Sequence, residues 1–332
     1  MPNFWLHVAP PGARACRRAG AAVLAAATAT CAACATPAAA RPDDGRPVVL
    51  TTFTVLADMA GAVAGPDAHV ESITGVGMEI HGYEPTPDDL RRAAGADLLL
   101  ANGLGLEAWL EALVEPLDLP TVELADEVDV DHLPTQGTRA GASGTGSPGT
   151  DHAPLNPHLW MSPDLGVRYV GAIADALADL DPAHAAAYEE RATAYAAQIE
   201  AIRTDLTERL EGLPEAHRLL VTCEGAFSYL ARDAGLAEAY LWPVNAERQG
   251  TPRQVADVIR AVRAAQVPAV FCESTVSATA QRQVARETGA RFAGVLYVDS
   301  LSEPDGPVPT YLDLLRHDAD VVVAGLTGEE AS

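Results

Sequence analysis

Four side chains have types and surroundings that suit one divalent cation: His81, His158, Glu224 and Asp299. Imidazole nitrogen suits zinc, copper, iron and nickel, whereas carboxylate oxygen suits magnesium, calcium and manganese. A mixed set of two imidazoles and two carboxylates therefore points to manganese, iron or zinc. Because the four residues are spread over both halves of the chain, a metal that bound all of them would tie the two halves together.

Each candidate ligand also has an ordinary explanation when it is taken alone. His81 fits a polar residue of a surface turn, and Glu224 fits a negative charge at the start of a helix, where the helix dipole favours it. Each of the four nevertheless follows an apolar stretch or precedes a turn, and ligands of α/β folds bind in the crevice beyond the carboxyl ends of the strands. The metal interpretation therefore depends on whether the four residues meet.

Length and composition limit the classes of protein that are possible. A chain of 332 residues with 48% hydrophobic and 20% charged residues is foldable and long enough for two domains. The formal net charge of -24 argues against nucleic acid, which requires a basic face. An acidic surface suits a cation, although it also serves solubility alone. The sequence contains no lysine, which excludes a Schiff base and a P-loop lysine.

An export signal is predicted over residues 1–34. Three arginines precede an Ala-rich apolar run at 19–29, which is too short to span a membrane because a spanning helix needs about 20 apolar residues. Cys34 follows small residues and is predicted to be the acylated cysteine of a bacterial lipoprotein, with simple secretion after cleavage as the alternative. Residues 35–46 then form a tether.

The rest of the chain alternates short β-branched runs with amphipathic stretches, which predicts an α/β fold with parallel sheets flanked by helices. A first lobe is expected over residues 47–162, and its flexible loop at 131–157 is rich in Gly, Ser, Thr and Pro. Its predicted strands lie at 48–52, 70–73, 96–101 and 121–124, with helices between them that include 104–114.

A linker helix is predicted over residues 163–182, because Ser162 and Pro163 form a helix start and Asp181-Pro182 forms a stop. A second lobe is expected over 183–332. It begins with a long helix, and its predicted strands lie at 219–221, 239–241, 269–271, 293–296 and 320–324.

Two cysteines, Cys223 and Cys272, lie at the ends of predicted strands of the second lobe. An exported protein folds in an oxidising compartment, so they bridge if the strands are neighbours. Two buried thiols, the commoner fate of cysteine in a core, are the favoured alternative. Glu273, which follows the second cysteine, fits structural hydrogen bonding as well as a role beside the metal.

Several motifs in order resemble the cluster A-I metal-binding solute proteins of bacterial ABC importers, which take up manganese, iron or zinc. MEIHGYEPTPDDL resembles the first metal loop of that family and makes His81 a ligand. NPHLWMSP places His158, and CEGAFSYLARDAGL places Glu224 where zinc-type relatives usually have histidine. VNAERQGTPRQV and FCEST match further family stretches, and LYVDSLSEPDG places Asp299 as the fourth ligand. The resemblance covers nearly all of 48–326.

The resemblance implies two α/β lobes joined by a single long helix, with the metal site in the cleft between them. It also implies an extracytoplasmic monomer, held at the membrane by its lipid, that delivers the cation to a permease powered by a cytoplasmic ATPase. Two imidazoles and two carboxylates favour manganese first, then iron(II), and then zinc, although raw affinity follows the Irving-Williams order, in which zinc can bind more tightly than the metal that is transported.

Two other classes of function stay open. An exported mononuclear metallohydrolase would use Glu224 as general base beside an open coordination position, but the sequence has neither an HExxH helix nor a GxSxG elbow. An adhesion or structural lipoprotein would use the metal for stability only.

Overall fold

The computed structural model describes residues 44–135, 154–244 and 250–328, all of which belong to one compact unit. The predicted signal with Cys34, the tether up to residue 43 and positions 136–153 of the predicted loop lie outside the described residues. At the edges of that loop, Pro134 and Leu155 form an isolated antiparallel bridge.

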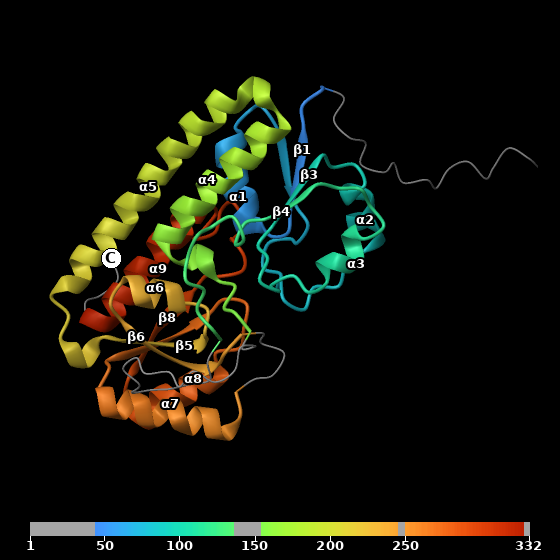
Figure 1. Ribbon diagram of the computed structural model, residues 1–332. Helices are drawn as coiled ribbons and strands as arrows, with labels where there is room; N and C mark the ends of the chain where they lie inside the picture. Colours follow the sequence, from blue (N-terminus) through green and yellow to red (C-terminus); the bar gives the residue numbers. More distant parts are fainter. Residues whose placement is uncertain (1–43, 136–153, 245–249, 329–332) are drawn as a thin grey trace, which may run out of the picture. The chain divides into compact units, whose positions relative to one another are not determined.

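The first half contains a parallel sheet whose strand order is β2-β1-β3-β4. Its strands are β1 (Val48–Thr51), β2 (His69–Ser72), β3 (Leu98–Ala101) and β4 (Thr121–Glu123). Its helices are α1 (Thr54–Ala64), α2 (Pro87–Ala93) and α3 (Leu110–Val114). β1 and β3 are buried along their whole length, as expected for near-continuous apolar strands at the centre of a parallel sheet. The predicted α/β fold with parallel strands is confirmed (Figure 1).

The second half contains two parallel strand pairs, β5 (Leu219–Glu224) with β6 (Ala237–Trp242) and β7 (Ala269–Glu273) with β8 (Arg291–Leu296). Helices α6 (Ser228–Asp233), α7 (Pro252–Ala265) and α8 (Thr279–Thr288) connect them. The side-chain amide of Gln281 joins the pairs, because it donates to the carbonyls of Val221 on β5 and Phe271 on β7.

Two long helices follow each other between the halves: α4 (Pro163–Leu180) and α5 (Ala185–Glu211). Ser162 caps α4 through the backbone N–H of Leu165, as the Ser-Pro pair predicts. Helix α5 lies along α4 and also contacts α1 and the C-terminal helix α9 (Tyr311–Thr327) (Figure 1). The connection is therefore helical, while the bounds 47–162, 163–182 and 183–332 remain a prediction.

Two predicted elements were wrong. The strand expected at 320–324 is part of α9, which Thr310 caps and in which Val322, Val323 and Leu326 are buried with earlier residues of the same face. Tertiary packing here overrides the β-propensity of a valine run. The helix expected at 104–114 begins only at 110. The positive φ angles of Leu104 and Gly105 exclude the first two expected residues from an α-helix.

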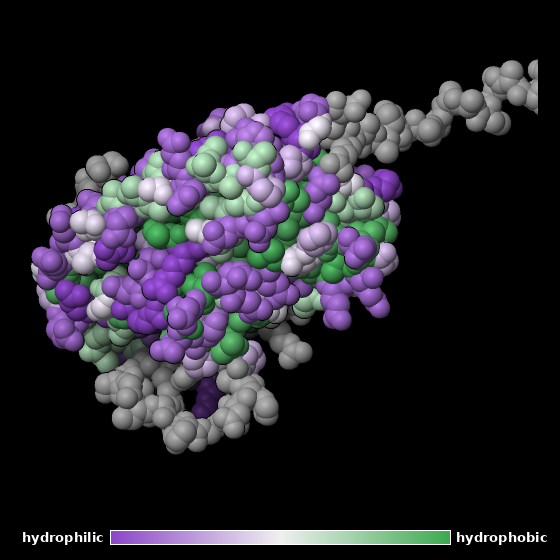
Figure 2. Space-filling view, turned by 45° about the horizontal axis from the view of Figure 1, so that its top comes forward, coloured by the Kyte–Doolittle hydropathy of each residue, from purple (hydrophilic) through white to green (hydrophobic). Residues whose placement is uncertain are grey.

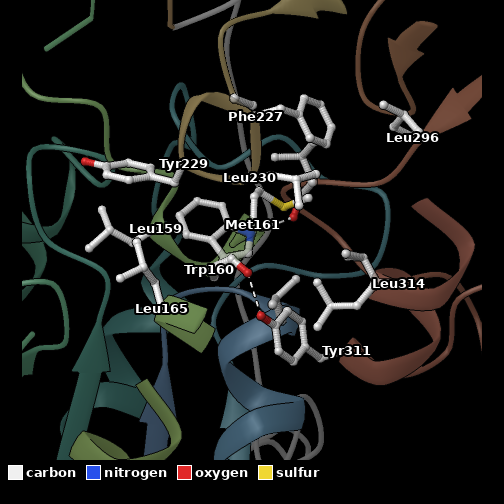
Figure 3. Close-up of a cluster of buried hydrophobic side chains, with 14 of the residues drawn as sticks. Leu159, Trp160, Met161, Leu165, Phe227, Tyr229, Leu230, Leu296, Tyr311 and Leu314 are labelled. Atoms are coloured by element: carbon white, nitrogen blue, oxygen red, sulfur yellow. Dashed lines mark hydrogen bonds between the residues drawn. The ribbon is translucent and has the colours of Figure 1, made fainter. Parts of the chain in front are cut away.

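A hydrophobic core joins the two halves. Trp160 and Met161 from the first half pack with Phe227, Leu296 and Tyr311 from the second, and all five are fully buried (Figure 3). Short 3-10 helices at Leu159–Met161, Pro182–His184 and Glu215–His217 complete the described elements. The first of these places the large Trp160 side chain directly beside the loop that carries His158, so core packing and site geometry are linked.

A disulfide joins Cys223 and Cys272, whose Cα atoms lie 4.9 Å apart, so the favoured alternative of two buried thiols was wrong. The bridge forms because β5 and β7 are neighbours, which the order of strands in the sequence does not reveal. It closes a loop of 49 residues, for which the chain-entropy model gives about 4 kcal/mol of stabilisation. Both sulfurs are consumed in this bond, so neither offers a thiolate to a metal.

Within the described ranges, no helix has the length and apolar character that a membrane crossing requires. The face seen in Figure 2 mixes hydrophilic and hydrophobic residues. Among the described side chains, the exposed large hydrophobic ones are Val76, Met78, Leu90, Leu155 and Val295.

Candidate metal centre

The structure brings His81, His158, Glu224 and Asp299 together. His81 lies in the segment between β2 and α2, and His158 precedes the 3-10 helix at Leu159–Met161. Glu224 is the last residue of β5, and Asp299 follows β8. Two donors therefore come from each half of the molecule.

The spacing of these groups suits an ion between them better than direct hydrogen bonds. Nε2 of His81 lies 3.7 Å from Oε1 of Glu224, and Nε2 of His158 lies 3.7 Å from Oδ1 of Asp299. These distances exceed hydrogen-bond length. Two donor atoms that each lie about 2.0–2.2 Å from one ion are at most about 4.4 Å apart, so 3.7 Å is a spacing that a shared ion allows.

Three of the four residues carry buried polar atoms that lack a hydrogen-bond partner among the described residues. These atoms are both ring nitrogens of His81, Nε2 of His158 and Oδ1 of Asp299. Their side chains are at most 3% exposed. Buried polar atoms are normally paired because an unpaired one costs about 1–3 kcal/mol. His81, His158 and Asp299 can each offer an atom within 4.8 Å of the others, so these three residues can hold one ion in common.

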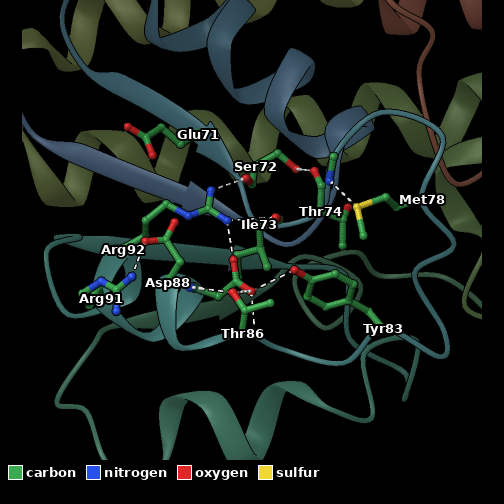
Figure 4. A network of polar contacts seen from close by, with 12 residues as sticks. Glu71, Ser72, Ile73, Thr74, Met78, Tyr83, Thr86, Asp88, Arg91 and Arg92 are labelled. Carbon is green, nitrogen blue, oxygen red and sulfur yellow. Dashed lines mark hydrogen bonds and ion pairs between the residues drawn. The ribbon is translucent and has the colours of Figure 1, made fainter. Parts of the chain in front are cut away.

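The loop that carries His81 is held rigidly from both sides. The Glu79 carboxylate accepts from the backbone N–H groups of His81 and Gly82, and the Trp109 indole donates to the carbonyl of Ile80. Downstream, Asp89 accepts from Tyr83 and from Thr86, which caps α2, and Arg92 donates to the carbonyls at the end of β2 (Figure 4). A preorganised ligand loses little entropy when it binds an ion.

The Glu224 backbone is anchored by a second buried acid. The Glu273 carboxylate accepts from the backbone N–H of Glu224 at 3.2 and 3.3 Å. Burial raises the pKa of Glu273 to about 8, despite the backbone N–H groups that it accepts. The structure therefore shows the structural hydrogen bonding that was one of the two roles left open for Glu273, and this bonding holds the backbone of a candidate ligand.

Burial also sets the protonation of the donors. Burial lowers the pKa of His81 to about 4. Burial also lowers the pKa of His158 well below its ordinary value, and the nearby His81 ring lowers it further. Burial, with repulsion from Glu224 and Glu79, raises the pKa of Asp299 well above its ordinary value. At neutral pH both imidazoles are therefore uncharged and able to donate a lone pair to a cation.

Sequence reasoning assigned no role to several residues that surround the donors. Glu79, Asn156 and Trp160 all lie within quoted motifs, two residues from a candidate ligand histidine. That proximity was the available signal, because metal-bound histidines need a second partner that orients the ring. Which side chain supplies it becomes visible only in three dimensions.

Residues 49–325 match the sequence profile of a family described as periplasmic component A of the zinc-uptake complex. The iron-binding protein YfeA of Yersinia pestis is 47% identical over 279 residues, which cover 83% of this chain and 85% of that protein. The manganese-binding lipoprotein MntA of Halalkalibacterium halodurans is 31% identical over 280 residues, with 84% and 88% coverage.

Solved structures agree with these sequence matches. A manganese-bound periplasmic metal-binding protein from Candidatus Liberibacter asiaticus superimposes with a TM-score of 0.76 and 35% identity, covering 85% of this chain and 100% of that chain. The periplasmic zinc-binding protein TroA from Treponema pallidum has a TM-score of 0.75 at 24% identity, which shows a common fold.

Proposed function

We propose a function for this chain on the basis of its family, the periplasmic zinc-uptake component A proteins, to which the chain belongs. In this proposal the protein captures a divalent transition metal outside the cytoplasm and delivers it to a membrane permease that a cytoplasmic ATPase powers. His81, His158, Glu224 and Asp299 bind the cation, which is the cargo, and no bond in it is made or broken.

One observation carries the proposal: buried donor atoms without hydrogen-bond partners converge from both halves of the molecule. A site divided between two halves binds an ion fully only where both halves supply their donors. The rival metallohydrolase would need an open coordination position for water. The relatives are named as metal-binding or transport proteins, which fits the reading that this chain is not an enzyme.

Manganese is the proposed cargo, with iron(II) second and zinc third. The donor set of two imidazoles and two carboxylates is harder than a site with three imidazoles, and bidentate carboxylates allow a coordination number above four. The names of similar proteins include iron, manganese and zinc, so the order rests on donor chemistry.

We expect the protein to bind one manganese ion and to be stabilised by it against thermal unfolding. A ligand that binds only the folded state at about 100 times its Kd stabilises that state by about 2.7 kcal/mol. Thermal unfolding of metal-free protein with equal concentrations of Mn²⁺, Fe²⁺ or Zn²⁺, combined with competition titrations, makes the comparison. A shift with zinc only would move the assignment to zinc uptake, and no shift with any cation would remove the function.

Membrane attachment through Cys34 is part of the same proposal, and it is supported by relatives that are named as lipoproteins. We expect protein from the membrane fraction to begin at an acylated Cys34, and a Cys34→Ser variant to be released from that fraction. Mass spectrometry of the mature N-terminus decides this. A free amino terminus downstream of Cys34 in membrane-associated wild-type protein would contradict it.

A further inference from the structure

The short segment Asn156–Trp160 contacts both halves of the candidate site. The Asn156 side chain, which is 1% exposed, donates from Nδ2 to the carbonyl of Gly225 at 2.7 Å and to Oγ of Ser228 at 3.1 Å. Its Oδ1 accepts from the backbone N–H of His158 and lies 2.9 Å from the Nδ1 atom of that ring. One amide thus connects a ligand of the first half to the residue that follows Glu224.

These contacts determine where the His158 proton lies. A backbone carbonyl only accepts hydrogen bonds, so the amide nitrogen of Asn156 must face Gly225 and its oxygen must face His158. Because that oxygen also only accepts, Nδ1 of His158 must carry the hydrogen. The lone pair of the neutral ring is therefore on Nε2, the atom that has no partner and faces Asp299.

The other end of the segment reaches the fourth donor. The Trp160 indole N–H donates to the carbonyl of Val298 at 3.1 Å, and Val298 directly precedes Asp299. Both groups are buried, and the Tyr311 hydroxyl donates to the Trp160 carbonyl, which fixes the tryptophan backbone (Figure 3). The Trp160 ring also lies 5.1 Å from the His158 ring, measured between centroids.

We propose that Asn156–Trp160 is a template that sets three of the four donors, with Asn156 and Trp160 as positioning residues. It carries His158 in the tautomer that presents Nε2, and it holds the backbones beside Glu224 and Asp299 at fixed positions relative to that ring. This inference rests on the proposed function for the identity of the ligand, since it assigns the geometry of the same site.

Two measurements on purified protein test the template. The first is calorimetric titration of Mn²⁺ into metal-free wild type, Asn156→Ala, Asn156→Asp and Trp160→Phe, together with the thermal unfolding midpoint of each metal-free variant. The second is the His158 tautomer in metal-free protein, read from nitrogen–hydrogen correlation spectra of the imidazole. Trp242→Phe is the matched control, because its buried indole N–H has no partner among the described residues.

We expect Asn156→Ala and Trp160→Phe each to weaken Mn²⁺ binding by roughly 10- to 100-fold, the usual effect of losing a partner that orients a metal ligand. Trp242→Phe should bind like wild type. Asn156→Asp keeps an acceptor for His158 but loses the donor to Gly225, so it should keep the Nδ1–H tautomer and still bind more weakly. Asn156→Ala should lose that tautomer preference.

Binding close to wild type in both Asn156→Ala and Trp160→Phe would overturn the template, whatever happens to their unfolding midpoints. A hydrogen on Nε2 of His158 in metal-free wild type would overturn it as well, and this readout requires no variant to fold. Failure of wild type to bind any cation would instead defeat the proposed function, while the tautomer would still decide the geometry inferred for Asn156.

Discussion

Replacing Asp299 with alanine is expected to abolish most Mn²⁺ binding while leaving the metal-free protein at least as stable as wild type. The carboxylate is 2% exposed, has an oxygen without a hydrogen-bond partner and lies 3.7 Å from the Nε2 atom of His158. Losing a direct ligand should cost more than the roughly 10- to 100-fold that loss of an orienting partner costs. Burial raises the pKa of this group well above its ordinary value, so the carboxyl group opposes folding at neutral pH.

Removal of that unpaired group should raise the free energy of unfolding of the metal-free protein by about 1–3 kcal/mol, less whatever the small cavity costs. Calorimetric titration gives the affinity, and urea unfolding gives the stability. Asp305→Ala is the matched control, because Asp305 is an exposed acid in the same loop. A metal-free variant much less stable than wild type would mean that Asp299 is structural. Tight Mn²⁺ binding retained in both Asp299→Ala and His81→Ala would contradict the assignment of the metal donors.

The fold could be predicted in large part because local signals and tertiary structure agree. β1 and β3 are buried apolar runs, and Ser162 with Pro163 starts α4 where the helix begins. The valine run at 321–323 failed as a strand prediction because its neighbours in α9 provide one buried helical face, and periodicity over a longer window would have revealed it. Short apolar runs are ambiguous between helix and strand for this reason.

The candidate site also has one part that could be predicted from the sequence and one part that could not. The four donors could be chosen from residue types and ordered motifs, because each motif is local in sequence. Their partners could not, because Asn156 contacts Gly225 and Trp160 contacts Val298 only after the chain has folded. The disulfide has the same origin, since Cys223 and Cys272 become neighbours through the side-by-side placement of β5 and β7. Long-range contacts of this kind produce no characteristic spacing of residues in the sequence.

The second large effect concerns pH: Mn²⁺ affinity should rise steeply as pH rises, and binding should release protons. The metal needs a deprotonated Asp299, whose pKa burial raises well above the ordinary value in the metal-free protein. Where that carboxyl group is protonated, each proton released on binding changes the affinity tenfold per pH unit, about 1.4 kcal/mol. The imidazoles add little above pH 6.5, because burial lowers both of their pKa values and they are already neutral.

The free energy of unfolding of the metal-free protein should fall as pH rises from 6.5 to 8, whereas the Mn²⁺ affinity rises. Glu273 has a pKa of about 8 when folded against an ordinary 4.5, so between these values the folded state holds a proton that the unfolded state has lost. Stability from such a group is complete below pH 4.5 and is lost as pH rises through 8. The lowered histidine pKa values act with the opposite sign, but only below their ordinary 6.5.

Calorimetry in buffers of different ionisation enthalpy counts the protons released, and unfolding with and without Mn²⁺ at pH 6.5 and 8 measures both trends. The gap between metal-bound and metal-free stability should widen with pH. Glu273→Gln separates the two acids, because it removes the Glu273 titration while an amide oxygen can still accept from the Glu224 N–H. Proton release that persists in this variant does not come from Glu273. Affinity that is flat across this range would mean that Asp299 is already ionised before the metal arrives, and that its negative charge is balanced inside the site.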